Sequence, residues 1–325
     1  GAISGSGTAA ASAMGSIIGP IEKDEGYDPN FSAAANIATA PTGLLIPPSN
    51  VMITFSLVSG GTSVAALFMA GYIPGALWAL ACMLVVYIYA KKAGYRSQTK
   101  LTGKEKFNAF IQALPCLLLI VIVIGGIIAG VFTATEGSVV AVVYSLLLSI
   151  YGYKSMKWKD LPEIFRASAE MTGIIIFLIG VSSIMSWVMA FTNIPTMVSN
   201  GLLSISSNKY VILLMINIIL LVVGTFMDMT PATLIFTPIF LPVCTALGMN
   251  TIHFGIMLIF NLCIGTITPP VGTTLFVGVK VGGVKIETVF KHLLPYFFAI
   301  IVVLMLVTYI PQLSLWLPGL MGYVS

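Results

Sequence analysis

Three long stretches of this chain contain no Asp, Glu, Lys or Arg: residues 29–90, 171–208 and 229–279. Each exceeds the roughly 20 apolar residues that a helix needs to cross a bilayer. Their apolar residues run continuously instead of alternating, which favours helices over the strands of a membrane barrel. Over all 325 residues only 8% are charged, against about 25% in a soluble domain. The sequence therefore predicts an all-α polytopic membrane protein embedded in a lipid bilayer, and excludes soluble enzymes and nucleic-acid-binding proteins.

The remaining charged residues lie mainly in four clusters, at residues 22–28, 91–106, 154–170 and 280–291. Because basic loops stay on the cytoplasmic side, these clusters orient the chain. The resulting topology has crossings at residues 72–90, 108–131, 137–153, 170–192 and 293–311, an outer loop over 193–208 and an external C-terminus. The four cysteines lie inside apolar runs without CxxC spacing, so no transition-metal site is expected.

Two proline pairs interrupt apolar segments, Pro47-Pro48 in the first half of the chain and Pro269-Pro270 in the second. When the sequence is overlaid on itself with a shift of 222 positions, these pairs coincide, and so do Pro20 with Pro242 and Gly43 with Gly265. On the predicted topology, the matched segments enter the membrane from opposite sides. Paired broken helices of this kind indicate an inverted-topology repeat with a transport site between its halves.

A second irregularity precedes the second break. The apolar runs 210–225 and 231–248 are each short for a full crossing, and Asp228 lies between them. We expect a re-entrant helical hairpin that enters from outside, with its tip at Asp228, and an equivalent tip at residues 4–8. Because the second repeat has about 120 residues ahead of its tip, we also expect roughly one hundred residues with scaffold helices ahead of Gly1.

The breaks and the tips carry the chemistry that we assign to this chain. Proline cannot donate a backbone hydrogen bond, so each pair stops its helix and frees carbonyl oxygens, which suit a small hard cation such as Na+. Candidate oxygen ligands at the two breaks are Thr42, Gly43, Ser49 and Asn50, and Thr266, Thr268, Gly272 and Thr273. Each tip begins a helix, whose N-terminal N–H groups favour a carboxylate.

Plainer interpretations of the same residues stay open. Each proline pair alone is compatible with a simple kink, and the Gly-Ser-Gly tip with close helix packing. Asp228 is also well placed to cap the helix that follows it. An acid within the membrane is nevertheless a candidate functional residue, so we expect Asp228 both to cap and to line the cavity.

Short motifs in both halves resemble a known family. They are GAISGSG at 1–7, GYD at 26–28, GLLIPPSN at 43–50 and AGYIPG at 70–75, and then GTFMD at 224–228, PIFLP at 238–242, HFG at 253–255, GTITPPVG at 265–272 and LWLP at 315–318. These motifs resemble the large membrane subunit, DctM type, of TRAP transporters, and the resemblance spans the whole chain. One departure is TATEG at 133–137, where the family usually has TPTEA, at a helix start away from both breaks.

The resemblance implies an elevator-type secondary transporter, not an enzyme, in the bacterial cytoplasmic (inner) membrane, with Na+ as coupling ion and no cofactor. Its implied partners are a small four-helix membrane subunit of DctQ type, separate or fused, and a periplasmic substrate-binding protein of DctP type. The substrate would be an organic acid, such as a C4-dicarboxylate or sialic acid. Carried over by motif, the sodium ligands are Ser4, Gly5, Ser6, Thr42, Gly43, Asp228, Thr230, Thr266, Thr268 and Gly272. The substrate would lie between the tips, at Ser6, Thr8, Ser49, Asn50, Thr230 and Thr273.

On this interpretation the chain is divided by function. Residues 1–60 and 209–283 supply transport-domain elements, residues 61–107 a scaffold arm helix and cytoplasmic loop, residues 108–208 scaffold helices, and residues 284–325 the C-terminal scaffold helix. The alternative is a related inverted-repeat anion permease that works without a binding protein. A passive channel and an intramembrane hydrolase that uses Asp228 are further alternatives, although no catalytic partner for that acid is evident.

Overall fold

The computed structural model describes residues 5–95, 102–206 and 208–323, and these residues form helices and connecting turns without any strand. The chain divides into two compact units, one made of Gly1–Ser97 with Met185–Ser325 and one of Gln98–Ile184. Seven helices in the described ranges are long and apolar enough to cross a membrane, or up to eight if a bent pair is counted as one span. The prediction of an all-α polytopic membrane protein is thereby confirmed.

The first half of the larger unit contains the first proline break. Its helices are α1 (Gly7–Asp24), α2 (Pro29–Thr39), α3 (Thr42–Leu45), α4 (Asn50–Val58) and α5 (Val64–Ala93). The break between α3 and α4 falls at Pro47-Pro48, as predicted, because neither proline nitrogen can donate to the preceding turn. An additional interruption separates α2 from α3, which the sequence analysis did not predict. Pro41 lies at that point and removes one more helical hydrogen bond.

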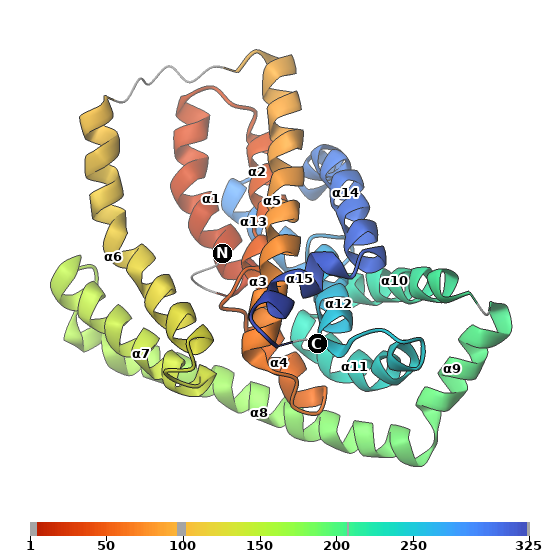
Figure 1. Cartoon of the computed structure of the whole chain (residues 1–325). Coiled ribbons are helices and arrows are strands. Elements are labelled where there is room, and N and C mark those ends of the chain that lie inside the picture. The colour runs from red at the N-terminus through yellow and green to blue at the C-terminus, as the bar shows by residue number, and fades with distance from the viewer. Residues whose placement is uncertain (1–4, 96–101, 207, 324–325) are drawn as a thin grey trace. The chain divides into compact units, whose positions relative to one another are not determined.

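The second half of this unit contains the second break. Its helices are α9 (Ile194–Ile205), α10 (Lys209–Phe226), α11 (Met229–Ala246), α12 (Thr251–Thr266), α13 (Thr273–Gly282), α14 (Ile286–Tyr309) and α15 (Gln312–Leu320). The chain leaves helical geometry at Ile267 and resumes it at Thr273, so the break predicted at Pro269-Pro270 is confirmed. In Figure 1, α10, α11 and α12 lie together, and the packing of each pair agrees.

Helix starts in the two halves recur at the spacing that the sequence overlay gave. Helices α1 and α11 begin at Gly7 and Met229, and α5 and α14 begin at Val64 and Ile286, so each pair is 222 residues apart. The packing recurs as well, because α1 packs on α13 while α11 packs on α4. Where the halves meet, the thiol of Cys263 lies 3.9 Å from the carbonyl oxygen of Pro41, its counterpart 222 positions earlier.

The core of this unit forms where α5 and α14 pack on α2 and α12. Trp78 of α5 is fully buried, stacks near Phe260 of α12 and donates its indole N–H to the carbonyl oxygen of Ala38 at 2.9 Å. Tyr296 of α14 is likewise fully buried and packs near Phe31 of α2. Thus α5 and α14 share a core with the broken helices.

The smaller unit contains α6 (Gly103–Ile128), α7 (Ala134–Leu147), the short turns η1 (Leu148–Gly152) and η2 (Trp158–Asp160), and residues 161–184 of α8 (Leu161–Phe191). Capping boxes start two of these helices. Thr102 pairs with Glu105 at the start of α6, and Thr133 pairs with Glu136 at the start of α7. Glu136 therefore has a local structural role at a helix start.

Candidate functional site

The loop between α10 and α11 lies against the second break. Asp228 is the N-cap residue of α11, as the capping interpretation expected, but its carboxylate makes no capping hydrogen bond. Instead, the hydroxyl of Thr273, at the start of α13, donates to Oδ1 of Asp228 at 3.4 Å. The backbone N–H of Val271 also donates to the carbonyl oxygen of Thr225 at 3.1 Å. Two bonds thus join the end of α10 and the loop after it to the residues that follow Pro269-Pro270.

Glycines let the backbone approach closely at this second break. A Cβ built on Gly265 would overlap the backbone of Gly224 in α10, so the two helices touch at this level. A Cβ built on Gly272 would lie 2.7 Å from the carbonyl oxygen of Thr268 and 3.0 Å from that of Thr266. The carbonyl oxygens of Thr266 and Thr268 therefore both lie close to the Gly272 backbone, and that of Thr268 accepts from the Gly272 N–H at 3.1 Å.

The tip at the start of α1 lies against the first break. Gly5 has a φ of +59°, which side-chain-bearing residues rarely adopt, and a Cβ there would lie 2.9 Å from the carbonyl oxygen of Pro48 and 3.6 Å from the nitrogen of Asn50. Ser6 is the N-cap of α1 and accepts from the Ala9 N–H. Its hydroxyl lies 3.0 Å from that of Thr8. Ser4 falls outside the described residues.

One residue that the sequence analysis missed connects the first tip to the second half. A Cβ on Gly7 would lie 2.9 Å from the hydroxyl oxygen of Thr274 in α13. Thr274 is buried, and its hydroxyl has no hydrogen-bond partner; the same holds for Ser49 at the start of α4. Buried hydroxyls without a partner are costly, so both are candidates to bind a ligand. The internal repeat gave no signal for Thr274, because Met52 occupies the matching position.

The hydroxyls of three other predicted threonines at the breaks donate to backbone carbonyl oxygens three or four residues earlier in the chain. Thr42 donates to the carbonyl oxygen of Thr39 at 2.6 Å, Thr266 to that of Cys263 at 2.8 Å and Thr268 to that of Ile264 at 2.6 Å. Each hydroxyl oxygen keeps lone pairs after donating its proton. Gly43 is buried, Thr230 is partly buried and Asn50 is exposed. The structure thus brings each tip, within the described residues, against its break.

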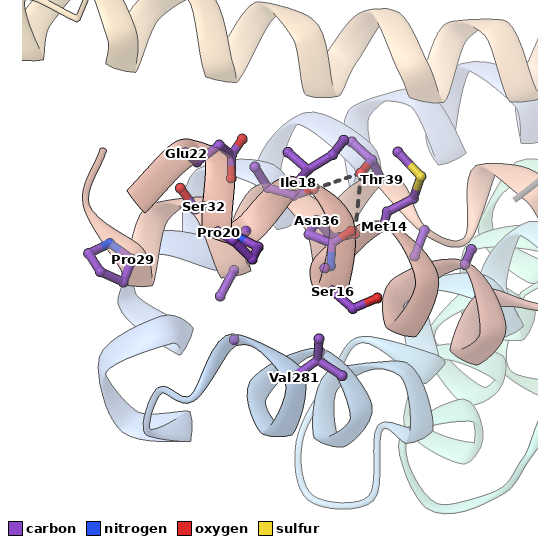
Figure 2. Close-up of a pocket in the computed structure, with 18 of the residues that line it drawn as sticks. Met14, Ser16, Ile18, Pro20, Glu22, Pro29, Ser32, Asn36, Thr39 and Val281 are labelled. Carbon is purple, nitrogen blue, oxygen red and sulfur yellow. Dashed lines mark hydrogen bonds between the residues drawn. The ribbon is translucent and has the colours of Figure 1, made fainter. Parts of the chain in front are cut away.

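A well-defined cavity lies elsewhere in this unit. It has a volume of about 690 Å³ and runs along α1, α2 and α13. Figure 2 shows Met14, Pro20, Asn36 and Val281 around it, with Thr39 bonded to the backbone of its own helix. Of the predicted site residues it reaches only Thr42, so the expected substrate position between the tips and this cavity are different places.

Comparison with known proteins identifies the family of this chain. The family model described as "Tripartite ATP-independent periplasmic transporter, DctM component" matches residues 1–313, which include both tips and both breaks. The chain belongs to this DctM family. The resemblance inferred from the short motifs is thereby confirmed. Because the family consists of membrane transporter permeases, it also supports an integral membrane protein that is not an enzyme.

Three relatives show how this DctM chain compares along its length. It is 53% identical over 320 residues to the uncharacterized protein YgiK of Salmonella typhimurium. This alignment covers 98% of this chain and 73% of the relative. It is 37% identical to the isethionate TRAP transporter permease protein DctMQ of Oleidesulfovibrio alaskensis, and the alignment covers 98% of this chain and 50% of that relative. It is 36% identical to the sialic acid TRAP transporter large permease protein SiaM of Vibrio cholerae, and the alignment covers 99% of this chain and 75% of that relative. The chain therefore spans between half and three quarters of these relatives.

Proposed function

We propose that this DctM chain is the large permease of a Na+-coupled TRAP transporter that imports an organic acid. The observation that carries the proposal is that each helix-starting tip lies directly on a proline break, Gly5 on Pro48 and Asp228 beside Thr273. A tip supplies helix N-terminal N–H groups, which attract an anion, and a break supplies carbonyl and hydroxyl oxygens, which attract a cation. One arrangement thus offers neighbouring sites for an organic anion and its coupling ion.

We assign two sodium sites to these pairs. The first consists of Ser4, Gly5 and Ser6 with Thr42 and Gly43, and the second of Asp228 and Thr230 with Thr266, Thr268 and Gly272. The second site has the stronger support, because Asp228 supplies a negative charge beside Thr273, directly after the break. The substrate would lie between the tips, near Ser6, Thr8, Ser49, Asn50, Thr230 and Thr273. We add Thr274, because its buried hydroxyl has no partner.

For the movement we propose an elevator, in which transport elements from both halves of an inverted-topology repeat slide against a scaffold. The 222-residue recurrence of helix starts and the reciprocal packing of α1 on α13 and α11 on α4 support the repeat. The transport elements are residues 1–60 and 209–283, and α6 to α8 serve as scaffold. The sequence alone predicts that residues 61–107 and 284–325 belong to the scaffold. Because α5 and α14 share a core with the broken helices, we propose that they move with the transport elements.

The partners follow from the relatives. The names of SiaM and DctMQ refer to sialic acid and isethionate, which are both organic anions, and the name DctMQ suggests a fused small subunit. We propose that this chain works with a DctQ-type small subunit and a DctP-type periplasmic binding protein in the bacterial inner membrane, with its C-terminus outside. The substrate would be a C4-dicarboxylate, sialic acid or a similar organic acid.

The test is uptake into proteoliposomes that contain the full-length permease, its small subunit and its binding protein. Uptake of a C4-dicarboxylate, sialic acid and isethionate is measured with and without an inward Na+ gradient. We expect one acid to accumulate only with the gradient. Uptake that is independent of Na+ would exclude the coupling and support a passive channel. Undiminished uptake without the binding protein would support the stand-alone anion permease instead.

A further inference from the structure

Helix α10 is fastened to its neighbours at three levels that are seven residues apart, at Tyr210, Asn217 and Gly224. Seven residues make about two helical turns, so these positions lie on one face of α10. At the first level, the hydroxyl of Tyr309 in α14 donates to the carbonyl oxygen of Tyr210 at 3.0 Å, and the two rings lie 5.7 Å apart. This end of α10 is thus joined to the end of α14.

The second level is a buried polar chain that crosses three helices. Asn217 of α10 is fully buried and donates to the hydroxyl of Thr308 in α14 at 3.0 Å. Asn261 of α12, also fully buried, donates to the side-chain oxygen of Asn217 at 2.7 Å. Separating these helices would expose amides to an apolar interior, where unpaired polar groups are expensive. The chain therefore opposes any movement of α10 away from α12 and α14.

The third level lies at the end of α10, beside the break. The backbone contact between Gly224 and Gly265 leaves no room for any side chain. At the next residue of α10, the Thr225 carbonyl oxygen accepts from the N–H of Val271. The end of α10 is therefore fixed to both sides of the break that follows α12.

The partner helix of α10 is held in the same way. Helix α11 packs on α12 and, across the repeat, on α4. Opening this pair as a gate would require α10 to leave α12 and α14, and α11 to leave α4. Each step would break contacts between buried faces.

We propose that the α10–α11 pair is not a gate, and that Asn217 is a positioning residue that fixes α10 to α12 and α14 so that they move as one piece. This rests on the proposed transport function, and it deepens that function by assigning substrate access to displacement of the whole piece. A swinging gate would instead need α10 to separate from α14 in every transport cycle.

The test links α10 covalently to α14. In a full-length permease whose native cysteines are replaced, Tyr210→Cys and Tyr309→Cys are joined by a short bifunctional thiosulfonate, with each single-cysteine variant as control. We expect the linked protein, reconstituted with its small subunit and binding protein, to keep uptake within about twofold of the unlinked protein, because the link preserves an existing contact. A loss of uptake on linking that is restored by reduction would overturn the proposal.

A second measurement does not depend on transport. The rate of linking is followed with and without Na+ and each candidate acid, and we expect no change. A severalfold slower reaction in any condition would show α10 leaving α14 and would overturn the proposal. If no acid is transported at all, the proposed function fails, whereas the linking rates still report on α10.

The role of Asn217 itself is tested by rescue. We expect Asn217→Ala to lower the maximal uptake rate, and the link between positions 210 and 309 to restore at least about half of it, since the link replaces the lost fastening. A variant that is merely misfolded would not be rescued. Absence of any recovery would remove Asn217 as the positioning residue.

Discussion

Ser6 and Asp228 occupy matching positions, 222 residues apart, and both are N-cap residues, yet they act differently. The Ser6 hydroxyl caps its own helix by accepting from Ala9. The Asp228 carboxylate makes no cap bond and accepts from Thr273 of the neighbouring helix. In the first half, the residue at this position caps its own helix, α1. In the second half, the residue at the matching position joins the start of α11 to the start of α13. A repeated fold does not require a repeated site.

The two halves also differ in how their broken helices are covered. Helix α12 is buried from Ile252 to Thr266, with α10 packed along it. In α2, the matching face is partly open: Ala35 and Thr39 are half-buried and line the 690 Å³ cavity of Figure 2. Position 39 matches Asn261, which bonds to α10. The second half is thus tightly covered, and the first half has a groove where the second has a helix.

The largest effect should come from filling a close backbone-to-backbone contact of the covered half. Gly265→Ala would insert a methyl group into the backbone of Gly224, and two packed helices cannot easily separate. We expect a loss of about 1–3 kcal/mol or more in stability, measured by thermal unfolding of the purified protein. The matched control is Gly19→Ala in α1, where a Cβ meets nothing within 4 Å. It should be neutral or stabilising by up to about 1 kcal/mol. Equal losses in the two variants would show that the backbone contact at Gly265 contributes nothing beyond a general effect of replacing a helical glycine.

The next effect concerns charge at the matched cap positions. Asp228→Asn keeps the shape of the side chain and removes its charge. We expect half-maximal uptake to need at least about tenfold more Na+, because a charged ligand contributes over a kcal/mol more than a neutral one. Glu136→Gln is the control, since that acid caps α7, in the smaller compact unit, which contains neither break. An unchanged Na+ requirement in Asp228→Asn would leave the two tips equivalent and would remove Asp228 from the sodium site.

A smaller effect separates the covered from the open broken helix. Asn261→Ala would remove a donor to Asn217 inside a buried chain, and we expect a loss of about 1–2 kcal/mol in stability. Its match, Thr39→Ala, removes a hydroxyl that bonds only its own helix beside a cavity. That substitution should cost less than about 0.5 kcal/mol in the same unfolding measurement. A larger loss at Thr39 than at Asn261 would contradict the comparison.

The proline pairs and the apolar runs in the sequence predicted the parts of this fold that depend on local backbone chemistry. Proline pairs end helices wherever they occur, so both breaks were located correctly, as was the helix that begins after Asp228. Contacts between segments distant in sequence left no such mark. Asn217, Asn261 and Thr308 lie in unrelated apolar runs, and only the packing of α10, α12 and α14 brings them together. Thr274 was missed for the same reason, because its importance comes from Gly7, more than half the chain away.

The smallest effect tests the local role of Ser6. Ser6→Ala removes the hydroxyl that caps α1, and we expect a loss of about 0.5–1 kcal/mol in stability, measured without Na+ so that ion binding does not contribute. Ser6→Thr is the control, since it keeps the capping oxygen and should recover most of the loss. Adding Na+ then separates the two roles. If Ser6 is also a sodium ligand, Na+ should stabilise the wild-type protein more than Ser6→Ala, because the ion binds the folded state more weakly when an oxygen is removed. Equal stabilisation by Na+ would limit Ser6 to capping and would leave Asp228 as the cap-position residue with a role in ion binding.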